Sequence, residues 1–299
     1  NIQRSNIFAI VSSKWMEKQV KQSPIWKNKK IYFLPFGINQ NIFKPISKSE
    51  IIKIKKDLKI NVKNSVIMLR ADDGKFKGLD IVKNTLNKID EKNISIIVVG
   101  KKNLLNEFKN KFDIHEYGWI KDDLFLAKLY QISDLFLMPS RQETFGLMAI
   151  EAMNCETLVI ALDSPGSALP EVINSPSEGI AVKEEKYPDT VIKMLKNNSL
   201  RNNLAKKCYE FAKENYNLET YLEKLTNIYL EIIEFHKNNV MNVESKVLLS
   251  QLKKIENTEL DESTLMATNN KILYLYRKLP INFRKKVKRI LRLNETSKS

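Results

Sequence analysis

The sequence predicts an α/β protein in which a doubly wound parallel sheet is followed by helices. Three observations support this fold class. Apolar runs of four to seven residues alternate with amphipathic helical stretches between residues 65 and 182. The runs are apolar throughout, which is typical of parallel strands that helices cover on both faces. Beyond Val182 only the helical periodicity continues, as far as about Lys237.

The apolar runs are the expected strands of the sheet, and the stretches between them are its expected helices. The strands are Ser65–Leu69, Ile94–Val99, Leu135–Met138, Leu158–Leu162 and Gly179–Val182, and the helices centre on Asp80–Ile89, Leu104–Phe112, Asp122–Ile132, Leu147–Met153 and Ala168–Ile173. Ahead of the sheet, the pattern predicts a strand at Ile7–Val11, a helix capped by Ser12 or Ser13, a strand at Ile31–Leu34 and a charged helix at Lys48–Lys59.

The composition excludes several classes of protein. The 299 residues are 43% apolar, which is enough for a packed core and rules out disorder over most of the length. Two histidines and two cysteines cannot build a Cys/His zinc cluster or a disulfide framework. No apolar run reaches the roughly 18 residues of a membrane-spanning helix. No Gly-x-Gly-x-x-Gly motif follows any strand, which disfavours a dehydrogenase.

The segment after the expected strand Leu135–Met138 is the most informative part of the chain. In open α/β sheets, ligands bind at the carboxyl ends of the strands. Here the strand runs into Pro139–Gly146 and then into a helix, whose first N–H groups can bind an anion. Gly146 lets the backbone approach a phosphate closely. Glu143 in the loop and Glu151 on the helix can accept hydrogen bonds from sugar hydroxyls. This layout suits a nucleotide sugar, which has hydroxyls at both ends and phosphates between them.

A second strand end supplies positive charge. Ser65–Leu69 ends at Arg70, and a loop that contains Lys77 and Gly78 leads into the next helix. If the strands are arranged as usual, Arg70 and Lys77 face the same crevice. Arginine offers phosphate a planar fork and lysine a point charge, so that the two could stabilise a diphosphate leaving group.

Four stretches carry a resemblance to a known family. Pro139–Met153 (PSRQETFGLMAIEAM) looks like the signature of the retaining family 4 glycosyltransferases, with its two glutamates separated by seven residues. Arg70–Gly78 resembles the diphosphate loop of that family, and Ile31–Pro45 resembles its interdomain stretch. Gly118–Trp119 matches a family glycine that precedes a helix. The resemblance covers roughly residues 5–238 in a consistent order.

The resemblance implies a GT-B fold, of which this chain holds the Rossmann-like donor-binding half, and sugar transfer with retention from a nucleotide sugar. Glu143 would contact the donor sugar, Glu151 would hold the ribose hydroxyls, and Arg70 and Lys77 would bind the diphosphate. Neither a metal ion nor another cofactor is implied. The candidate catalytic residues are Arg70, Lys77 and Glu143, and the candidate donor-binding residues are these three together with Thr144, Phe145, Gly146, Leu147 and Glu151.

The sequence departs from the family pattern at three positions. Phe36 stands where the Pro-x-Gly turn of the family has Asn, and Glu156 stands where the family has Gly. The glycine that often begins the donor loop is displaced to Gly166. This displacement weakens the case for Ala168–Glu171 as part of the site.

The resemblance and the composition together set the expected domain limits. Residues 1–45 would be the remnant of an N-terminal domain with its connection, 46–215 the nucleotide-sugar-binding domain, and 216–238 a crossover helix. Residues 239–270 are an expected linker, and 271–299 form a basic tail. Most of the acceptor-binding N-terminal domain of the family would then be missing.

The basic tail is expected to form an amphipathic helix over residues 279–293. Ten Lys or Arg and one acidic residue lie in 271–299, within a chain of formal net charge +15. Such a helix suits an anionic membrane surface. A solvated helix that packs on a protein partner and a nucleic-acid-binding tail are the alternatives. Nucleic acid is disfavoured as a partner because no recognition module accompanies the charge.

We therefore expect a cytoplasmic glycosyltransferase, peripheral on the inner face of the membrane, with a glycan or lipid-linked acceptor in capsule or lipopolysaccharide biosynthesis. Two alternatives stay open. One is a nucleotide-sugar epimerase on the same fold. The other is a donor-binding module that acts with a separate N-terminal chain, or a decayed remnant without activity.

Overall fold

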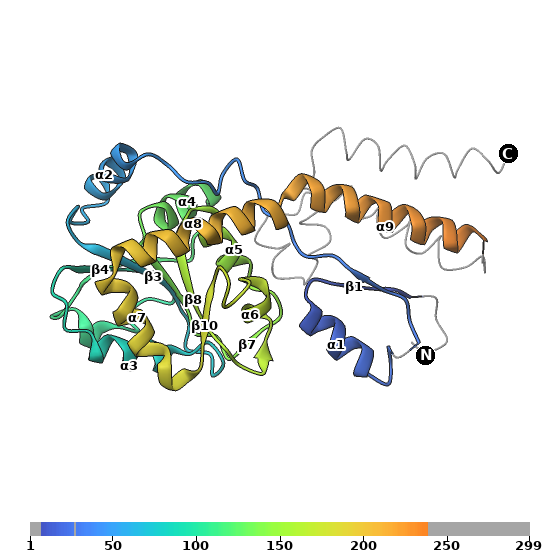
Figure 1. The fold of residues 1–299 in the computed structure, drawn as a ribbon, viewed down its shortest axis with the longest axis horizontal. Helices are drawn as coiled ribbons and strands as arrows, with labels where there is room; N and C mark the ends of the chain where they lie inside the picture. Colours follow the sequence, from blue (N-terminus) through green and yellow to red (C-terminus); the bar gives the residue numbers. More distant parts are fainter. Residues whose placement is uncertain (1–6, 27, 239–299) are drawn as a thin grey trace. The chain divides into compact units, whose positions relative to one another are not determined.

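A computed structural model describes residues 7–26 and 28–238, so the expected linker 239–270 and the basic tail 271–299 lie outside the described residues. Its centre is a six-stranded sheet in the order β10-β8-β6-β3-β4-β5, with every neighbouring pair parallel (Figure 1). The strands are β3 (Ser65–Ala71), β4 (Ile94–Gly100), β5 (Asp113–Gly118), β6 (Leu135–Met138), β8 (Leu158–Leu162) and β10 (Ile180–Val182). The predicted doubly wound parallel sheet is confirmed.

Helices connect the strands and cover the sheet. They are α3 (Leu79–Lys88), α4 (Asp123–Gln131), α5 (Leu147–Asn154) and α6 (Leu169–Val172), followed after β10 by α7 (Tyr187–Lys196), α8 (Asn198–Asn215) and α9 (Leu218–Asn238). The helix α3 packs against α7, whereas α5 packs against both α4 and α8. Side-chain caps start some of them: Asp122 accepts the Leu124 amide at the start of α4.

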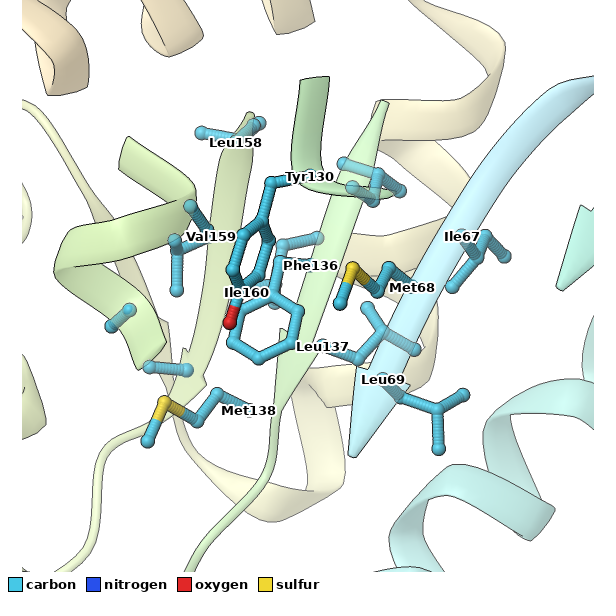
Figure 2. Packing of buried hydrophobic residues seen from close by; sticks show 14 of the residues in the cluster. Ile67, Met68, Leu69, Tyr130, Phe136, Leu137, Met138, Leu158, Val159 and Ile160 are labelled. Atoms are coloured by element: carbon cyan, nitrogen blue, oxygen red, sulfur yellow. The ribbon is translucent and has the colours of Figure 1, made fainter. Parts of the chain in front are cut away.

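The core lies around the central strands β3, β6 and β8 (Figure 2). Tyr130 of α4 and Phe136 of β6 are fully buried there and meet edge to face, with ring centroids 5.3 Å apart and an interplanar angle of 85°. Figure 2 shows the Tyr130 hydroxyl directed along the strands toward Met138, the last residue of β6. A buried polar group therefore points toward the carboxyl edge of the sheet.

The N-terminal part of the described chain contributes two short strands and two helices ahead of the six-stranded sheet. The strands β1 (Ala9–Val11) and β2 (Ile31–Phe33) pair in parallel, and α1 (Lys14–Gln22) connects them. Ser13 caps α1 by accepting the Met16 amide at 3.1 Å. The helix α2 (Lys48–Asp57) begins with a capping box, in which Ser47 and Glu50 satisfy each other's amides. The predicted elements of this region are confirmed.

The helix predicted at Leu104–Phe112 is wrong. The structure has only the 3₁₀ turn η2 (Asn106–Phe108) within a series of turns. Leu105, Phe108 and Phe112 are all buried, as a helical spacing suggests. Consecutive turns satisfy the same spacing, because they also bring residues three or four positions apart onto one side.

The strand β5 was missed by the sequence pattern. It lies at the edge of the sheet and pairs only with β4. An edge strand is covered on fewer sides than a central one and does not need a continuous apolar run. Its sequence, DIHEYG, therefore carries no signal of that kind. His115 in this strand lies beside Asp113, with Nε2 2.9 Å from a carboxylate oxygen of that residue.

Candidate active site

The order of the strands indicates where a ligand site is expected. From β3, the chain adds β4 and β5 on one side and then β6, β8 and β10 on the other. The connections therefore diverge between β3 and β6, and the crevice outside the carboxyl ends of two such strands is the usual ligand site of open α/β sheets. The predicted strand-end residues follow these two strands, at Arg70–Gly78 and Pro139–Gly146.

The loops after β3 and β6 are joined to each other. The Arg141 amide donates to the carbonyl oxygen of Phe76 at 2.8 Å. Gly78 has φ +73°, and a Cβ there would collide with the carbonyl oxygen of Pro139. Only glycine fits this close approach in the left-handed conformation. The Arg141 guanidinium also pairs with Asp80 on α3, with the nearest atoms 2.6 Å apart.

Two helices begin at this junction with glycine as the N-cap. Gly78 starts α3 and Gly146 starts α5, both in the left-handed conformation and without a side-chain cap among the described residues. A Cβ at Gly146 would lie 2.6 Å from Cδ2 of Leu169. The first amides of both helices carry partial positive charge. The junction therefore offers N–H groups to an anion from two sides.

Lys77 and Glu143, predicted on different strand ends, are brought together by the structure. Their side chains form an ion pair with Nζ and Oε2 3.2 Å apart, and they are 32% and 20% exposed. Glu143 was expected in a loop but lies in the two-residue strand β7 (Gln142–Glu143), which pairs with β9 (Gly166–Ser167). We call β7 and β9 the mini-sheet. It holds the backbone of Glu143 in place beside the start of α5.

Arg70, the second predicted cation, lies at the exposed end of β3. Its guanidinium is 3.5 Å from a carboxylate oxygen of Asp72. It also lies 4.9 Å from the ring centroid of Trp119, whose side chain is 65% exposed just beyond β5. Arg70 therefore keeps donors available at the carboxyl edge while an aromatic face supports it.

Glu151 meets the buried tyrosine of the core. The Tyr130 hydroxyl donates to Oε2 of Glu151 at 3.1 Å. Burial raises the pKa of Glu151 to about 7; the Tyr130 hydrogen bond lowers it and the charge of Asp123 raises it further. Burial raises the pKa of the Tyr130 hydroxyl, and the positive charge of Arg70 opposes that rise. A carboxyl group near half ionisation at neutral pH thus lies on the helix that begins at the junction.

The other candidate residues lie around the start of α5. Thr144 and Leu147 are exposed, whereas Phe145 is buried and anchors the loop. The Phe145 ring contacts Phe36 edge to face with centroids 5.2 Å apart. Phe36, the departure from the family's turn, therefore packs under the signature segment. Glu156, the other departure, adopts φ +60° and keeps a left-handed turn that glycine would favour.

Sequence reasoning missed Tyr130, Arg141 and Trp119. The tyrosine is part of an amphipathic helix, and nothing in its spacing separates a core ring from one that reaches Glu151. Arg141 stands inside the signature segment but pairs with acids that are distant in the sequence. A tryptophan directly after a glycine and just ahead of an expected helix was the one signal available in the sequence.

Within residues 7–26 and 28–238, no group of three or more His, Cys, Asp and Glu is arranged to hold a metal ion. No helix in these ranges is long and apolar enough to cross a membrane.

A doubly wound parallel sheet with two glycine-started helices beside a Lys–Glu pair defines the class of protein as an α/β module. A sequence model of the family described as glycosyl transferases group 1 matches residues 50–211. The match covers more than half of the chain, which therefore belongs to this family.

Individual relatives agree with the assignment. WclY, an O-antigen biosynthesis glycosyltransferase of Escherichia coli, is 29% identical over 66% of this chain and 57% of its own length. The C-terminal domain of the group 1 family glycosyl transferase LpcC from Francisella tularensis is 25% identical, with a TM-score of 0.50 over 61% of this chain and 100% of that one. HepE from Anabaena, solved with UDP and glucose, has the same fold, with a TM-score of 0.65 at 17% identity over 77% of this chain and 64% of that one.

The matched relatives are longer than this chain. It spans 43%, 52% and 57% of three curated relatives, which is about half of their length.

Proposed function

We propose that this chain is the donor-binding half of a retaining glycosyltransferase that uses a nucleotide sugar. The observation that carries the proposal is the Lys77–Glu143 pair, which lies between two glycine-started helices where the sheet connections diverge. This arrangement places a cation, an anion and backbone donors together. A diphosphate flanked by hydroxyl-bearing sugars needs all three.

Each group has a role in this proposal. The amides at the starts of α3 and α5 bind the diphosphate together with Arg70 and Lys77. As the bond between the sugar and the phosphate breaks, negative charge develops on the diphosphate, and these donors stabilise it. No resident metal ion is required in this scheme. Glu143 accepts hydrogen bonds from the sugar hydroxyls, and Lys77 holds its carboxylate in place before the donor binds.

Glu151 takes the other end of the donor. Its carboxylate accepts hydrogen bonds from the ribose hydroxyls, while Tyr130 fixes one of its oxygens. Since ionisation strengthens acceptance, donor binding favours the charged form of a group whose pKa is about 7 in the free protein. Backbone groups at the start of α5 also face the donor in this proposal, and they belong to Thr144, Phe145, Gly146 and Leu147.

The acceptor is proposed to be a glycan or a lipid-linked sugar of a cell-surface polysaccharide, at the inner face of the cell membrane. Two relatives support this class of acceptor: WclY acts in O-antigen biosynthesis, and a Campylobacter jejuni relative acts on a diphospho-undecaprenol acceptor. The basic segment 279–293 is proposed to hold the protein on anionic lipid. Co-sedimentation with vesicles of anionic phospholipid tests that contact, and equal binding with and without residues 271–299 would contradict it.

A thermal-shift panel of nucleoside diphosphates and their sugar conjugates tests the donor site. At a hundred times its Kd, a ligand stabilises the folded state by about 2.7 kcal/mol. We expect one nucleoside diphosphate to raise the melting temperature of the wild type and of Glu185→Gln. Glu185 is an exposed carboxylate that forms no hydrogen bond or ion pair within the described part of the chain. The same ligand should have little effect on Glu151→Ala.

The panel also has a clear negative outcome. If no nucleoside diphosphate shifts the wild type, the proposed function is wrong. Incubation with the donor sugar alone distinguishes the epimerase alternative, because an epimerase returns an isomerised sugar nucleotide without any acceptor.

A further inference from the structure

The first turn of α1 contacts residues that lie far along the chain. The amides of Lys14 and Trp15 donate to the two carboxylate oxygens of Glu171, at 2.6 and 3.0 Å. Ser13 supplies acceptors for the next two amides, with its side chain and its carbonyl oxygen. Three of the four N–H groups that this helix start leaves without a partner inside the helix, those of Lys14, Trp15 and Met16, are therefore satisfied, and Glu17 makes the first intrahelical bond. Two of them are satisfied by a residue 156 and 157 positions away.

Two further hydrogen bonds join α1 to the mini-sheet. The Ser13 hydroxyl donates to the carbonyl oxygen of Thr144 at 2.8 Å, directly after β7. The indole Nε1 of Trp15 donates to the carbonyl oxygen of Pro165 at 2.8 Å, directly before β9. Each strand of the mini-sheet is thus bound to α1 at one end. Ser13 is fully buried in this contact.

The mini-sheet needs such support. Each of its strands has two residues, so it has few hydrogen bonds of its own. It nevertheless carries Glu143, whose carbonyl oxygen also accepts the Ala168 amide at 2.8 Å, just ahead of α6. Glu171 lies on α6. The negative carboxylate of Glu171 complements the positive end of the α1 dipole, so charge as well as geometry favours the contact.

We infer that Glu171 is a positioning residue that holds α1 against the mini-sheet and thereby sets the place of Glu143. The segment ahead of the sheet thus takes part in shaping the donor site, although it contributes no group to the ligand. This role rests on the proposed function, because it assumes that Glu143 contacts the donor. The contact itself does not depend on that assumption.

Hydrogen exchange of the full chain tests the contact. In Glu171→Ala, the amides of Lys14 and Trp15 lose their acceptor, and we expect them to exchange at least about tenfold faster than in the wild type. Glu171→Gln keeps only one of the two acceptor oxygens, so we expect it to restore the rate of one of these amides to within about threefold and to leave the other fast. Glu185→Gln is the matched control and should leave them unchanged. Wild-type rates in Glu171→Ala would overturn the inference.

Calorimetric titration with the nucleoside diphosphate found in the thermal-shift panel tests the positioning role. We expect Glu171→Ala to weaken binding about three- to tenfold and Glu171→Gln, which keeps one of the two acceptor oxygens, to recover part of the affinity. Trp15→Phe removes the indole N–H but keeps a ring, and it should weaken binding to a similar extent through a different bond of the same contact.

The two measurements separate the possible failures. Faster exchange with unchanged affinity in Glu171→Ala would overturn the positioning role and leave a merely structural contact. If the wild type binds no nucleoside diphosphate, the proposed function fails and the positioning role fails with it. The exchange rates then still decide whether α1 is held by Glu171.

Discussion

Replacing Glu151 by Gln should stabilise the folded protein, and increasingly so as the pH rises. The carboxyl group lies on α5 against the buried Tyr130, and burial raises its pKa from 4.5 to about 7. In the unfolded chain the group ionises near its ordinary value. Between about pH 4.5 and 7 the unfolded state therefore gains ionisation energy that the folded state does not.

The sign and the size of this effect follow from the pKa. A raised folded-state pKa contributes stability that is complete below the unfolded value and is lost as the pH rises through the folded value. At about 1.4 kcal/mol for each factor of ten, the change from 4.5 to about 7 corresponds to at most roughly 3 kcal/mol. The side chain keeps some solvent contact, which reduces the effect. The quantity to compare is the free energy of unfolding of Glu151→Gln minus that of the wild type. We expect this difference to be about 1–3 kcal/mol larger at pH 8 than at pH 5.

Urea unfolding of both proteins at pH 5 and pH 8 measures the difference. Glu185→Gln on the exposed surface is the control and should show no pH-dependent gain. A stability difference between Glu151→Gln and the wild type that is the same at both pH values would refute the reasoning. The same variant should lose nucleoside affinity, because an amide has one acceptor oxygen where the carboxylate has two.

Three further substitutions test other parts of the structure. Lys77→Ala should weaken nucleoside diphosphate binding by about 1–3 kcal/mol in calorimetry and lower the rate of transfer still more. Lys75→Ala in the same exposed loop is the control and should do neither. Equal effects of the two substitutions would contradict the diphosphate role of Lys77. Gly78→Ala should cost at least about 2 kcal/mol in urea unfolding, since the new Cβ would collide with a carbonyl oxygen of the β6 loop at a positive φ. Gly74→Ala, which would meet only a flexible side chain, is its control, and a neutral Gly78→Ala would count against the close packing of the two loops. Glu156→Gly should raise the free energy of unfolding by up to about 1 kcal/mol by relieving a left-handed glutamate. An unchanged or lower free energy of unfolding would show that the turn is not strained.

The main features of the fold follow from local patterns. Buried parallel strands must be apolar on both faces, so β3, β4, β6 and β8 appear in the sequence as continuous runs. The edge strand β10 is only half-buried, but its three residues are apolar as well. The helices between them repeat their apolar residues at the helical period. The edge strand β5 and the turns around Phe108 could not be predicted in this way. An edge strand is only partly covered, and buried turns imitate the spacing of a helix.

The candidate site divides along the same line. The motifs at strand ends predict that Arg70, Lys77 and Glu143 lie at the ends of β3 and β6 or in the segments directly after them. That Lys77 and Glu143 form an ion pair depends on the order of strands in the sheet, which places β6 beside β3 although two strands intervene in the chain.

By itself, the sequence determined which segments become strands and helices and which chemical groups stand at their ends, because backbone geometry and burial impose short periods on neighbouring residues. Only the tertiary structure decided that Tyr130 reaches Glu151 and that Glu171 receives the amides of α1. These contacts join residues from 21 to 157 positions apart, and the distance between such residues is set by packing of the whole sheet with its helices, for which no local period exists.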